Sequence, residues 1–547
     1  MKNALFLALF FCATADVSAL TNRVLIIGID GVMPSALAVA RTPNLEELKA
    51  NGCYSVRAVT HPVTHSAACW SSMFTGVWGD KHLVNDPGNS FAGNQFTKYP
   101  SFFKRLKSAN NSLQTLCFAR WSPLLTVVPD ADVKLSFSSD AAITAETCNR
   151  LTNSNPDVMY TILLDVDSAG HTYGWGATVT NYVKEIEKAD GRVGQMMAAL
   201  RSRPTYSQEN WLVIVLSDHG EHDHLDPERS RITFHVVSGP SAARGVMWPS
   251  PSIVDVCATV LTHMGVPIDP AWNLDSRVEG FPLPPIGYGS NLVVNGDAEA
   301  TSGTGAYATN RGVAWWFDIA DTTLGTYAGN PGFPSPASPG PTERGTNFFL
   351  GGIKTGWISQ RIDLSGVASD ADASRLSYLL SGWFGGAGAQ EDSASLTVNF
   401  LDATGTVLGT RRIGDVTATD RGFATGLVER SAEGDLPPGS RFAEFVLTTT
   451  AAQSGTTVND ASADNLSFVL NMKMDAPFSI LPIPSIPGHF SVMAPGLAGR
   501  IYTLERSVDL QIWTSAVELT GAGSLVVLTD PGAPAEGAFY RVRSRRP

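Results

Sequence analysis

The sequence predicts an α/β domain with a mainly parallel sheet flanked by helices, followed by an all-β jelly roll or sandwich and a small β module. In the first half of the chain, continuous apolar runs alternate with amphipathic segments, as in parallel strands that helices cover on both faces. In the second half, short runs of alternating polar and apolar residues are separated by turns rich in glycine, serine and threonine. That pattern is typical of antiparallel sheets.

Four apolar runs are the expected strands of the parallel sheet: RVLIIGID, LQTLCFA, DVMYTILLDV and NWLVIVLSD. The segment TPNLEELKANG is expected to form a helix between the first two runs. Thr42 is its expected N-cap, Pro43 suits the first turn, and Gly52 ends it, since these residue types are favoured at those helix positions. A longer helix is expected in TNYVKEIEKADGRVGQMMAALRSR.

Two proline-rich segments divide the chain. FPLPPIGYGS at residues 281–290 ends the α/β pattern, and LPIPSIPG precedes the last short β-rich stretch. The predicted units are a signal peptide at residues 1–19, an α/β domain at 20–286, a β-sandwich at 291–472 and a small β module at 486–547.

The N-terminus has the features of an export signal. Lys2 supplies a positive charge, residues 4–13 form a short apolar run, and the small residues up to Ala19 offer a cleavage site after it. The apolar run is too short to span a bilayer, and no later stretch reaches the necessary length. We therefore expect a secreted or periplasmic protein with no transmembrane segment.

Charge and cysteine content narrow the function further. A formal net charge of −12 argues against binding to a nucleic-acid polymer, because the protein has few cations to displace that polymer's counterions. A small anionic substrate stays compatible with this charge, since a bound metal ion dominates the local field. Five cysteines follow the signal peptide, and this odd number predicts one or two disulfides and a leftover thiol in an exported protein.

Carboxylates and imidazoles follow three of the expected strands. Asp30 comes after the first run, Asp167 and His171 come after the third, and Asp218 and His219 come after the fourth. Ligands bind beyond the carboxyl ends of the strands in open α/β sheets. Aspartate and histidine are zinc ligands, and two metal ions a few ångströms apart can stabilise an in-line displacement at phosphorus.

The motifs GIDGV, DSAGHTYG and SDHG, in this order, resemble the alkaline phosphatase superfamily, in particular its nucleotide pyrophosphatase/phosphodiesterase branch. TPNLEEL and FTGVWGDKH are similar as well, and the resemblance covers residues 24–265. It implies a two-zinc phosphoester hydrolase, with other divalent cations as alternatives, that acts on a small phosphoester substrate.

The resemblance also implies a nucleophile. The family places a threonine, serine or modified cysteine at the start of a helix, ten residues before the glycine of a Thr-Gly pair. Counting back from Gly76 reaches Ser66, with Thr64 as the alternative. Ser66 is expected to cap the helix, where the field is positive, and to attack phosphorus to form a covalent phosphoseryl ester.

The same resemblance assigns metal ligands. One zinc would lie among Asp30, Ser66, Asp218 and His219, and the other would be held by Asp167, His171 and a later histidine. The Pro-Glu-Arg run after HDHLD selects His224 as that histidine, while His222 stays open and His235 reads as a strand residue.

An asparagine after the family's Lys-His pair stabilises the transferring phosphoryl oxygens. Asn89 fits the NSF context and Asn85 is the alternative.

Three other readings stay open. A phosphomonoesterase would use a basic residue for the extra charge, with Arg57, Lys81 and Arg120 as the nearest candidates. A sulfatase is disfavoured, because Cys69 lacks the Cys-x-Pro-Ser-Arg context of a modified-cysteine nucleophile. From a different class, the chain could be a glycan-binding surface protein with an inactive catalytic domain.

The second half resembles secreted carbohydrate-binding jelly rolls. NLVVNGDAE at residues 291–299 and ASADNLSFVL at residues 461–470 look like their first and last strands. Polysaccharide is therefore a further expected partner, and in the alternative reading the tryptophans fill the sandwich core. The tryptophans that could stack on sugar rings are Trp315, Trp316, Trp357 and Trp383.

Overall fold

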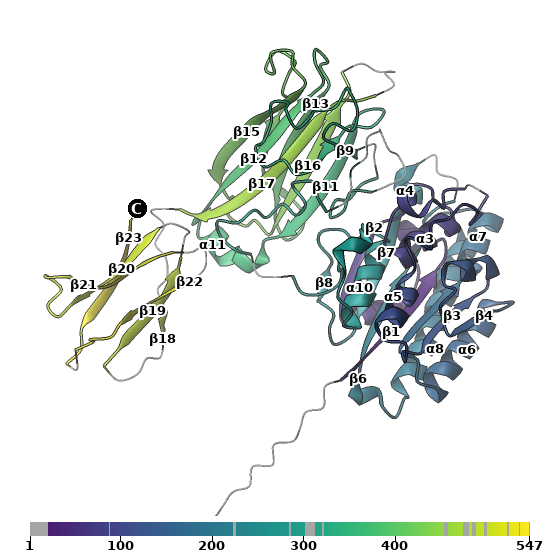
Figure 1. Cartoon of the computed structure of the whole chain (residues 1–547). Helices are drawn as coiled ribbons and strands as arrows, with labels where there is room; N and C mark the ends of the chain where they lie inside the picture. Colours follow the sequence, from purple (N-terminus) through teal and green to yellow (C-terminus); the bar gives the residue numbers. More distant parts are fainter. Residues whose placement is uncertain are drawn as a thin grey trace, which may run out of the picture.

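The computed structural model has three parts in chain order, an α/β domain, a β-sandwich and a small β module (Figure 1). Residues 1–19, where the export signal is predicted, and residues 223–225, which include His224, lie outside the described residues. The structure describes residues 20–86, 88–222, 226–283, 286–300, 303, 312–319, 322–452, 458–473, 481–483, 488–496, 500–521, 525–534 and 536–545.

An eight-stranded sheet forms the centre of the α/β domain. Its strands are β1 (Thr21–Ile29), β2 (Gly52–Val59), β3 (Thr115–Ala119), β4 (Val133–Ser136), β5 (Val158–Leu163), β6 (Glu209–Leu216), β7 (Ile232–Ser238) and β8 (Gly245–Val246). They lie in the order β4-β3-β5-β1-β6-β7-β2-β8. β1 pairs in parallel with β5 and β6, whereas β7 runs antiparallel to β6 and β2. The sheet is thus mainly parallel, as predicted.

Helices cover both faces of this sheet (Figure 1). They are α1 (Pro34–Leu37), α2 (Pro43–Ala50), α3 (Ser66–Thr75), α4 (Gly79–His82), α5 (Phe102–Ala109), α6 (Asp140–Asn153), α7 (Asp165–Tyr173), α8 (Thr180–Arg201), α9 (Pro227–Ser230) and α10 (Asp255–His263). Val24 and Ile26 of β1 belong to one apolar core, and Leu25 and Ile27 belong to the other. The continuous apolar run of β1 is needed because side chains alternate between two buried faces.

The cysteines correct the disulfide prediction. All five described cysteines are free thiols, and four of them are buried. Burial raises the pKa of Cys53 and of Cys257 to about 12, so both thiols stay protonated at neutral pH. They belong to the same apolar core as Trp70, where a thiol packs as a small apolar side chain.

The second part is a sandwich of two antiparallel sheets. Its elements are β9 (Thr323–Thr326), β10 (Asn347–Leu350), β11 (Gly356–Asp363), α11 (Ala368–Asp372), β12 (Leu376–Gly386), β13 (Ser393–Leu401), β14 (Val407–Gly414), β15 (Gly426–Asp435), β16 (Phe442–Thr450) and β17 (Ser462–Met472). The sheets have the orders β15-β12-β17-β10-β9 and β11-β16-β13-β14. β17 corresponds to the predicted last strand.

The predicted first strand at 291–299 is wrong. Asn291 makes only an isolated bridge to Val469 on β17, and the following residues form turns. Asn295 and Ala298 have φ angles of 52° and 60°, a left-handed conformation that a strand does not allow.

The four tryptophans of the sandwich have different environments. Trp316 is buried in the sandwich core, with its ring edge-on to that of Phe349 at 5.6 Å between centroids. Trp383 is half-buried and packs against a smaller apolar cluster that contains Phe348. Trp315 and Trp357 are also half-buried. Trp315 lies against the α/β domain, because the guanidinium of Arg277 lies 4.2 Å from its ring centroid.

Trp357 belongs to an apolar seam between the two domains. Phe317 and Ile319 of the sandwich form a cluster with Val59 of β2, and Ile232 of β7 and Trp357 pack against it. Val59 ends β2, just before the segment that leads to α3, and Ile232 begins β7. The sandwich is therefore packed against the two strand ends that flank the candidate site described below.

Phe317 is the central side chain of this seam. Its ring lies 4.2 Å from the guanidinium of Arg57 on β2 and stacks on Trp357 at 5.9 Å. Phe317→Ala is expected to lower the free energy of unfolding by about 2 kcal/mol, because it removes a buried aromatic ring and a cation–π contact. Urea denaturation measures this. Phe423→Ala, at a ring that is 62% exposed, is the control and should change stability by less than about 0.5 kcal/mol; equal effects would contradict the prediction.

The last part is a small module of two three-stranded sheets. Its strands are β18 (Leu481–Ile483), β19 (Phe490–Pro495), β20 (Ile501–Ser507), β21 (Thr514–Thr520), β22 (Leu525–Asp530) and β23 (Phe539–Arg545). The sheets have the orders β18-β19-β22 and β21-β20-β23, and Val492, Tyr502 and Leu504 contribute to the core between them. Within the part of the chain that the structure describes, no helix has both the length and the hydrophobicity needed to cross a bilayer.

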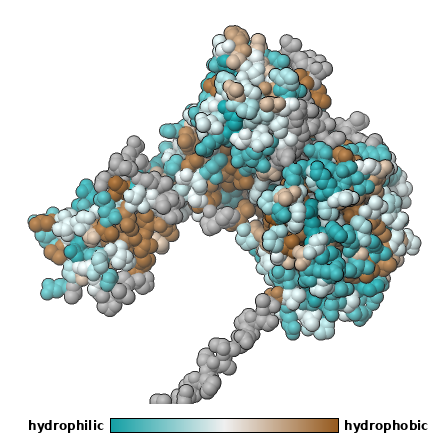
Figure 2. Space-filling model, viewed as in Figure 1, coloured by the Kyte–Doolittle hydropathy of each residue, from teal (hydrophilic) through white to brown (hydrophobic). Residues whose placement is uncertain are grey.

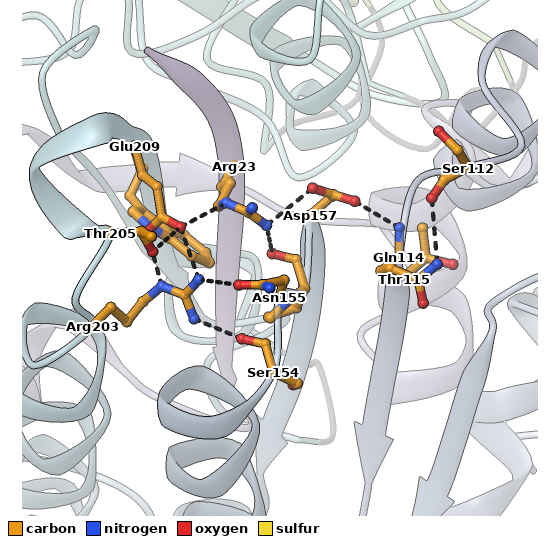
Figure 3. A network of polar contacts seen from close by, with 12 residues as sticks. Arg23, Ser112, Gln114, Thr115, Ser154, Asn155, Asp157, Arg203, Thr205 and Glu209 are labelled. Atoms are coloured by element: carbon orange, nitrogen blue, oxygen red, sulfur yellow. Dashed lines mark hydrogen bonds and ion pairs between the residues drawn. The ribbon is translucent and has the colours of Figure 1, made fainter.

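A polar network ties together the N-terminal ends of the central strands (Figure 3). Glu209, the first residue of β6, lies 2.8 Å from Arg203 and 3.0 Å from Arg23 of β1. Arg23 also lies 3.0 Å from Asp157, the residue before β5. β1, β5 and β6 are thus joined by charged side chains at one end, and their other ends carry the candidate site.

Candidate active site

The candidate site lies where three neighbouring parallel strands end. β5, β1 and β6 are adjacent in the sheet. Asp30 follows β1 directly, Asp167 lies in the first turn of α7 after β5, and Asp218 follows β6. Because parallel strands end at the same edge, their carboxylates meet there.

Asp30, Asp218 and His219 form a buried cluster. Their ligand atoms all lie within 4.8 Å of one another. His219 Nε2 lies 3.4 Å from Asp30 Oδ1 and 3.5 Å from Asp218 Oδ2. Among the described residues, Asp218 Oδ2 accepts no hydrogen bond. A buried carboxylate oxygen in this situation has an acceptor position that a ligand can fill.

The electrostatics of this cluster penalise ionised carboxylates. Burial raises the pKa of Asp30 well above its usual range, and repulsion by Asp218 and Asp167 adds to this. Burial likewise raises the pKa of Asp218, again with repulsion by Asp167. A divalent cation would remove this penalty, since opposite charge stabilises ionised carboxylates. Carboxylate oxygen and imidazole nitrogen are also zinc donors, so the donor set fits a metal ion.

Ser66 lies beside this cluster. Its hydroxyl donates to Asp30 Oδ1 at 3.4 Å and lies 3.3 Å from His219 Nε2. It is the first residue of α3, and His65 occupies the N-cap position. The expectation that Ser66 itself caps the helix is therefore wrong by one residue. The positive field at the helix N-terminus still acts on Oγ.

A second group of ligand-type side chains stands next to the first. Asp167 and His171 lie one turn apart on α7, with His171 Nε2 3.6 Å from Asp167 Oδ1. The ring of His222 lies 4.8 Å from that of His171 and 5.7 Å from that of His219. His222 is thus a second described histidine of the β6–β7 loop, besides His219, that reaches the site.

Asn89 hydrogen-bonds to the start of α3, whereas Asn85 hydrogen-bonds to α4. Asn89 Oδ1 accepts the backbone N–H of Ala67 at 3.0 Å. Asn85 instead donates to the carbonyl of Gly79 at 2.8 Å. Asn89 has a φ angle of 56°, a conformation that asparagine tolerates better than most residues.

The alternative nucleophile Thr64 and the strand histidine His235 have other environments. Thr64 is fully buried just before α3. His235 lies inside β7 and pairs with buried Glu279 at 3.0 Å, as expected for a strand residue.

All three candidate basic residues already have partners. Lys81 Nζ lies 2.6 Å from buried Asp275. Arg120 lies 2.5 Å from Asp165. Arg57 is stacked on Phe317 of the sandwich.

Sequence reasoning missed the aromatic side chains that support the site. Trp70 of α3 donates from Nε1 to Asp30 Oδ2 at 3.2 Å, and Tyr182 of α8 donates to the carbonyl of Gly31 at 2.6 Å. The ring of Trp175 lies edge-on to His171 at 5.6 Å. A Cβ on Gly31, whose φ is +68°, would lie 2.9 Å from that tryptophan. The sequence HTYGWG after the third strand was the available signal for Trp175.

The strand ends of the α/β sheet bring a serine, aspartates and histidines together at a helix N-terminus, and this part of the chain is similar to a class of hydrolases. Within that class, residues 24–109 and 120–229 match the family Type I phosphodiesterase / nucleotide pyrophosphatase. The match confirms the resemblance predicted for this part of the sequence. No curated protein is significantly similar to the chain.

Several solved structures share limited similarity with the chain. Murine ectonucleotide pyrophosphatase / phosphodiesterase 5, in an inactive form in complex with AMP, has 13% identity over 45% of this chain and 96% of that one, with a TM-score of 0.36. A 2-O GAG sulfatase has 12% identity over 46% and 72%, with a TM-score of 0.37. Ps i-CgsB in complex with k-i-k-neocarrahexaose has 13% identity over 64% and 87%, with a TM-score of 0.38.

Proposed function

We propose that the chain is a metal-dependent phosphoester hydrolase of the phosphodiesterase/nucleotide pyrophosphatase type, with Ser66 as its nucleophile. The observation that carries the proposal is the position of Ser66 Oγ, 3.4 Å from Asp30 Oδ1 and 3.3 Å from His219 Nε2. A serine at a helix N-terminus beside buried ligand-type side chains is arranged for nucleophilic attack.

Two groups of residues would hold metal ions, and zinc is the proposed identity. Asp30, Asp218, His219 and Ser66 would hold one ion, and Asp167 and His171 the other. For the third ligand of the second site we favour His222, because of its ring contact with His171. His224 lies outside the described residues. Bound metal ions would supply Lewis-acid stabilisation of the attacking and leaving oxygens.

The residues of the chain account for the remaining chemistry. Ser66 Oγ forms a bond to phosphorus, the bond to the leaving oxygen breaks, and that oxygen keeps the electron pair and takes up the proton that Ser66 Oγ loses. Asn89 holds the Ala67 N–H through Oδ1, so its Nδ2 is the group that donates to a phosphoryl oxygen. A water molecule then attacks the phosphoserine, its oxygen stays on phosphorus, and Ser66 leaves with a proton returned to Oγ.

The partners of the basic residues favour a diester over a monoester. A monoester carries one more negative charge, which Lys81, Arg120 or Arg57 would have to balance. Lys81 and Arg120 are already neutralised by aspartates, and Arg57 is held in the seam. A diester, with a single charge on its non-bridging oxygens, needs no further cation from these residues.

The cysteine argues against a sulfatase. Cys69 lies inside α3 and is fully buried. Its thiol points to the carbonyl of Val63 at 3.6 Å, and burial raises its pKa well above the usual range. A protonated, enclosed thiol is a poor nucleophile. We retain export to the cell exterior or periplasm as part of the proposal, on the sequence of residues 1–19.

Metal removal and a choice of substrates test the proposal together. The zinc-loaded protein should hydrolyse an aryl phosphodiester with a higher kcat/KM than the matching aryl monoester or aryl sulfate. EDTA should abolish the activity and added zinc should restore it. A larger kcat/KM for the monoester or the sulfate would reassign the substrate class, and full activity in EDTA would overturn metal dependence.

A further inference from the structure

The hairpin between β20 and β21 exposes several large apolar side chains to solvent. Val508, Leu510 and Ile512 are 69%, 56% and 70% exposed. Phe539, which pairs with Ser507 at the end of β20, is 50% exposed beside them. We call these four residues the apolar tip. Branched aliphatic side chains exposed together at a turn mark an interaction surface rather than ordinary surface composition.

Polar groups of this turn form hydrogen bonds with one another. Asp509 Oδ1 accepts the backbone N–H groups of Gln511 and Ile512, both at 2.9 Å. It also accepts the hydroxyl of Ser507 at 3.0 Å, and that hydroxyl accepts the N–H of Asp509. The loop therefore holds its exposed carboxylate against its own backbone and turns its hydrocarbon outward beside it. Backbone amides that already have partners lose little on leaving water, which is the condition for entering an apolar phase.

An aromatic and cationic collar lies behind the tip. Trp513 follows the turn, and the guanidinium of Arg541 on β23 lies 4.1 Å from its ring centroid. Arg543 lies two residues further along the same face of β23, and both arginines share one carboxylate, Glu505, at 2.6 and 3.8 Å. Tryptophan and arginine at the base of an apolar projection are the side chains preferred at a membrane interface.

The charge of the module differs from that of the rest of the chain. Residues 486–547 hold six arginines and five acidic residues, whereas the whole chain has a net charge of −12. Figure 2 shows apolar residues, in brown, on the face of this module in view. An apolar tip with arginines behind it complements a surface that is hydrocarbon below and anionic above.

We propose that the apolar tip inserts into an anionic lipid surface and anchors the enzyme there peripherally, with Arg541 and Arg543 against the headgroups. This inference concerns the last module and does not depend on the proposed hydrolase activity. A second copy of the chain is the alternative occupant, and the experiment below distinguishes it.

Vesicle co-sedimentation of the full chain tests the proposal. The protein should sediment with vesicles of phosphatidylcholine and phosphatidylglycerol, and less with phosphatidylcholine alone. Replacing Val508, Leu510 and Ile512 together by serine should weaken the partition coefficient by about a thousandfold, because each of the three side chains contributes on the order of a tenfold factor when buried. Arg541→Gln with Arg543→Gln should remove most of the preference for anionic vesicles and its salt dependence.

A matched control comes from the same module. Leu519, Leu525 and Val527 are 41%, 61% and 46% exposed on β21 and β22, and replacing them by serine should leave vesicle binding unchanged. Unchanged binding after the tip substitutions would overturn the proposal, as would an equal loss in the control or no sedimentation of the unmodified protein. A dimer in analytical ultracentrifugation that the tip substitutions dissociate, without vesicle binding, would assign the tip to self-association instead.

Discussion

Ser66→Ala is expected to lower kcat on an aryl phosphodiester by at least about a thousandfold, while the bound metal content stays nearly unchanged. Loss of a nucleophile removes the covalent route altogether, and single substitutions of this kind cost enzymes three or more orders of magnitude. The metal should remain because Asp30, Asp218 and His219 supply the buried donors without the serine. Steady-state kinetics and metal analysis on the same sample measure both effects.

Two further variants sharpen this test. Ser66→Thr keeps a hydroxyl at the first position of α3, so it should recover part of the lost activity. Thr64→Ala changes the alternative nucleophile, which is buried two residues earlier, and should retain at least about a tenth of kcat. If Ser66→Ala stays active and Thr64→Ala does not, the nucleophile is Thr64. If neither loses activity, the covalent mechanism is wrong.

The fold and the metal-type cluster could be predicted because they depend on local patterns. Continuous apolar runs can be covered only on both faces, so the parallel strands followed from them. Asp30 and Asp218 stand at the ends of two such runs, and parallel strands that end at one edge bring their flanking residues together.

The choice between similar residues within a loop could not be predicted in this way. His222 and His224 are two residues apart in a loop without periodicity. The course of the loop places His222 against His171, and His224 lies outside the described residues. The same holds for Asn89, whose contact with Ala67 depends on a left-handed backbone conformation.

Contacts between domains could not be predicted from the sequence either. An exposed or buried tryptophan has the same local signature, and the contacts of Trp315 with Arg277 and of Trp357 with the seam appear only in the folded chain. The prediction of disulfides was wrong for a related reason. Their number suggested pairing, but in the folded chain all five described cysteines are separate thiols, and four of them pack in one apolar core.

Glu209→Gln is expected to lower the free energy of unfolding by about 3 kcal/mol or more. The carboxylate is 3% exposed and Arg203 is 2% exposed, so removal of the charge leaves a buried guanidinium without its counter-ion. Arg23 loses its contact with Glu209 at the same time, which weakens the joint between β1 and β6. Urea denaturation of both proteins measures the difference. Glu47→Gln, in an exposed pair with Arg201, is the matched control and should cost less than about 1 kcal/mol.

The pH dependence provides an independent check of this ion pair. Burial alone would raise the pKa of Glu209, but hydrogen bonds from Arg203, Trp211 and Thr205 outweigh it and lower the pKa to about 2. A carboxylate with a lowered pKa contributes its full stability above its unfolded value, near 4.5, and loses it as the pH falls from there toward 2. The stability difference between the unmodified protein and Glu209→Gln should therefore be constant above pH 5 and shrink by up to about 1.4 kcal/mol per pH unit below 4.5. A difference that stays constant down to pH 2 would mean that the charge of Glu209 is not what stabilises the ends of β1 and β6.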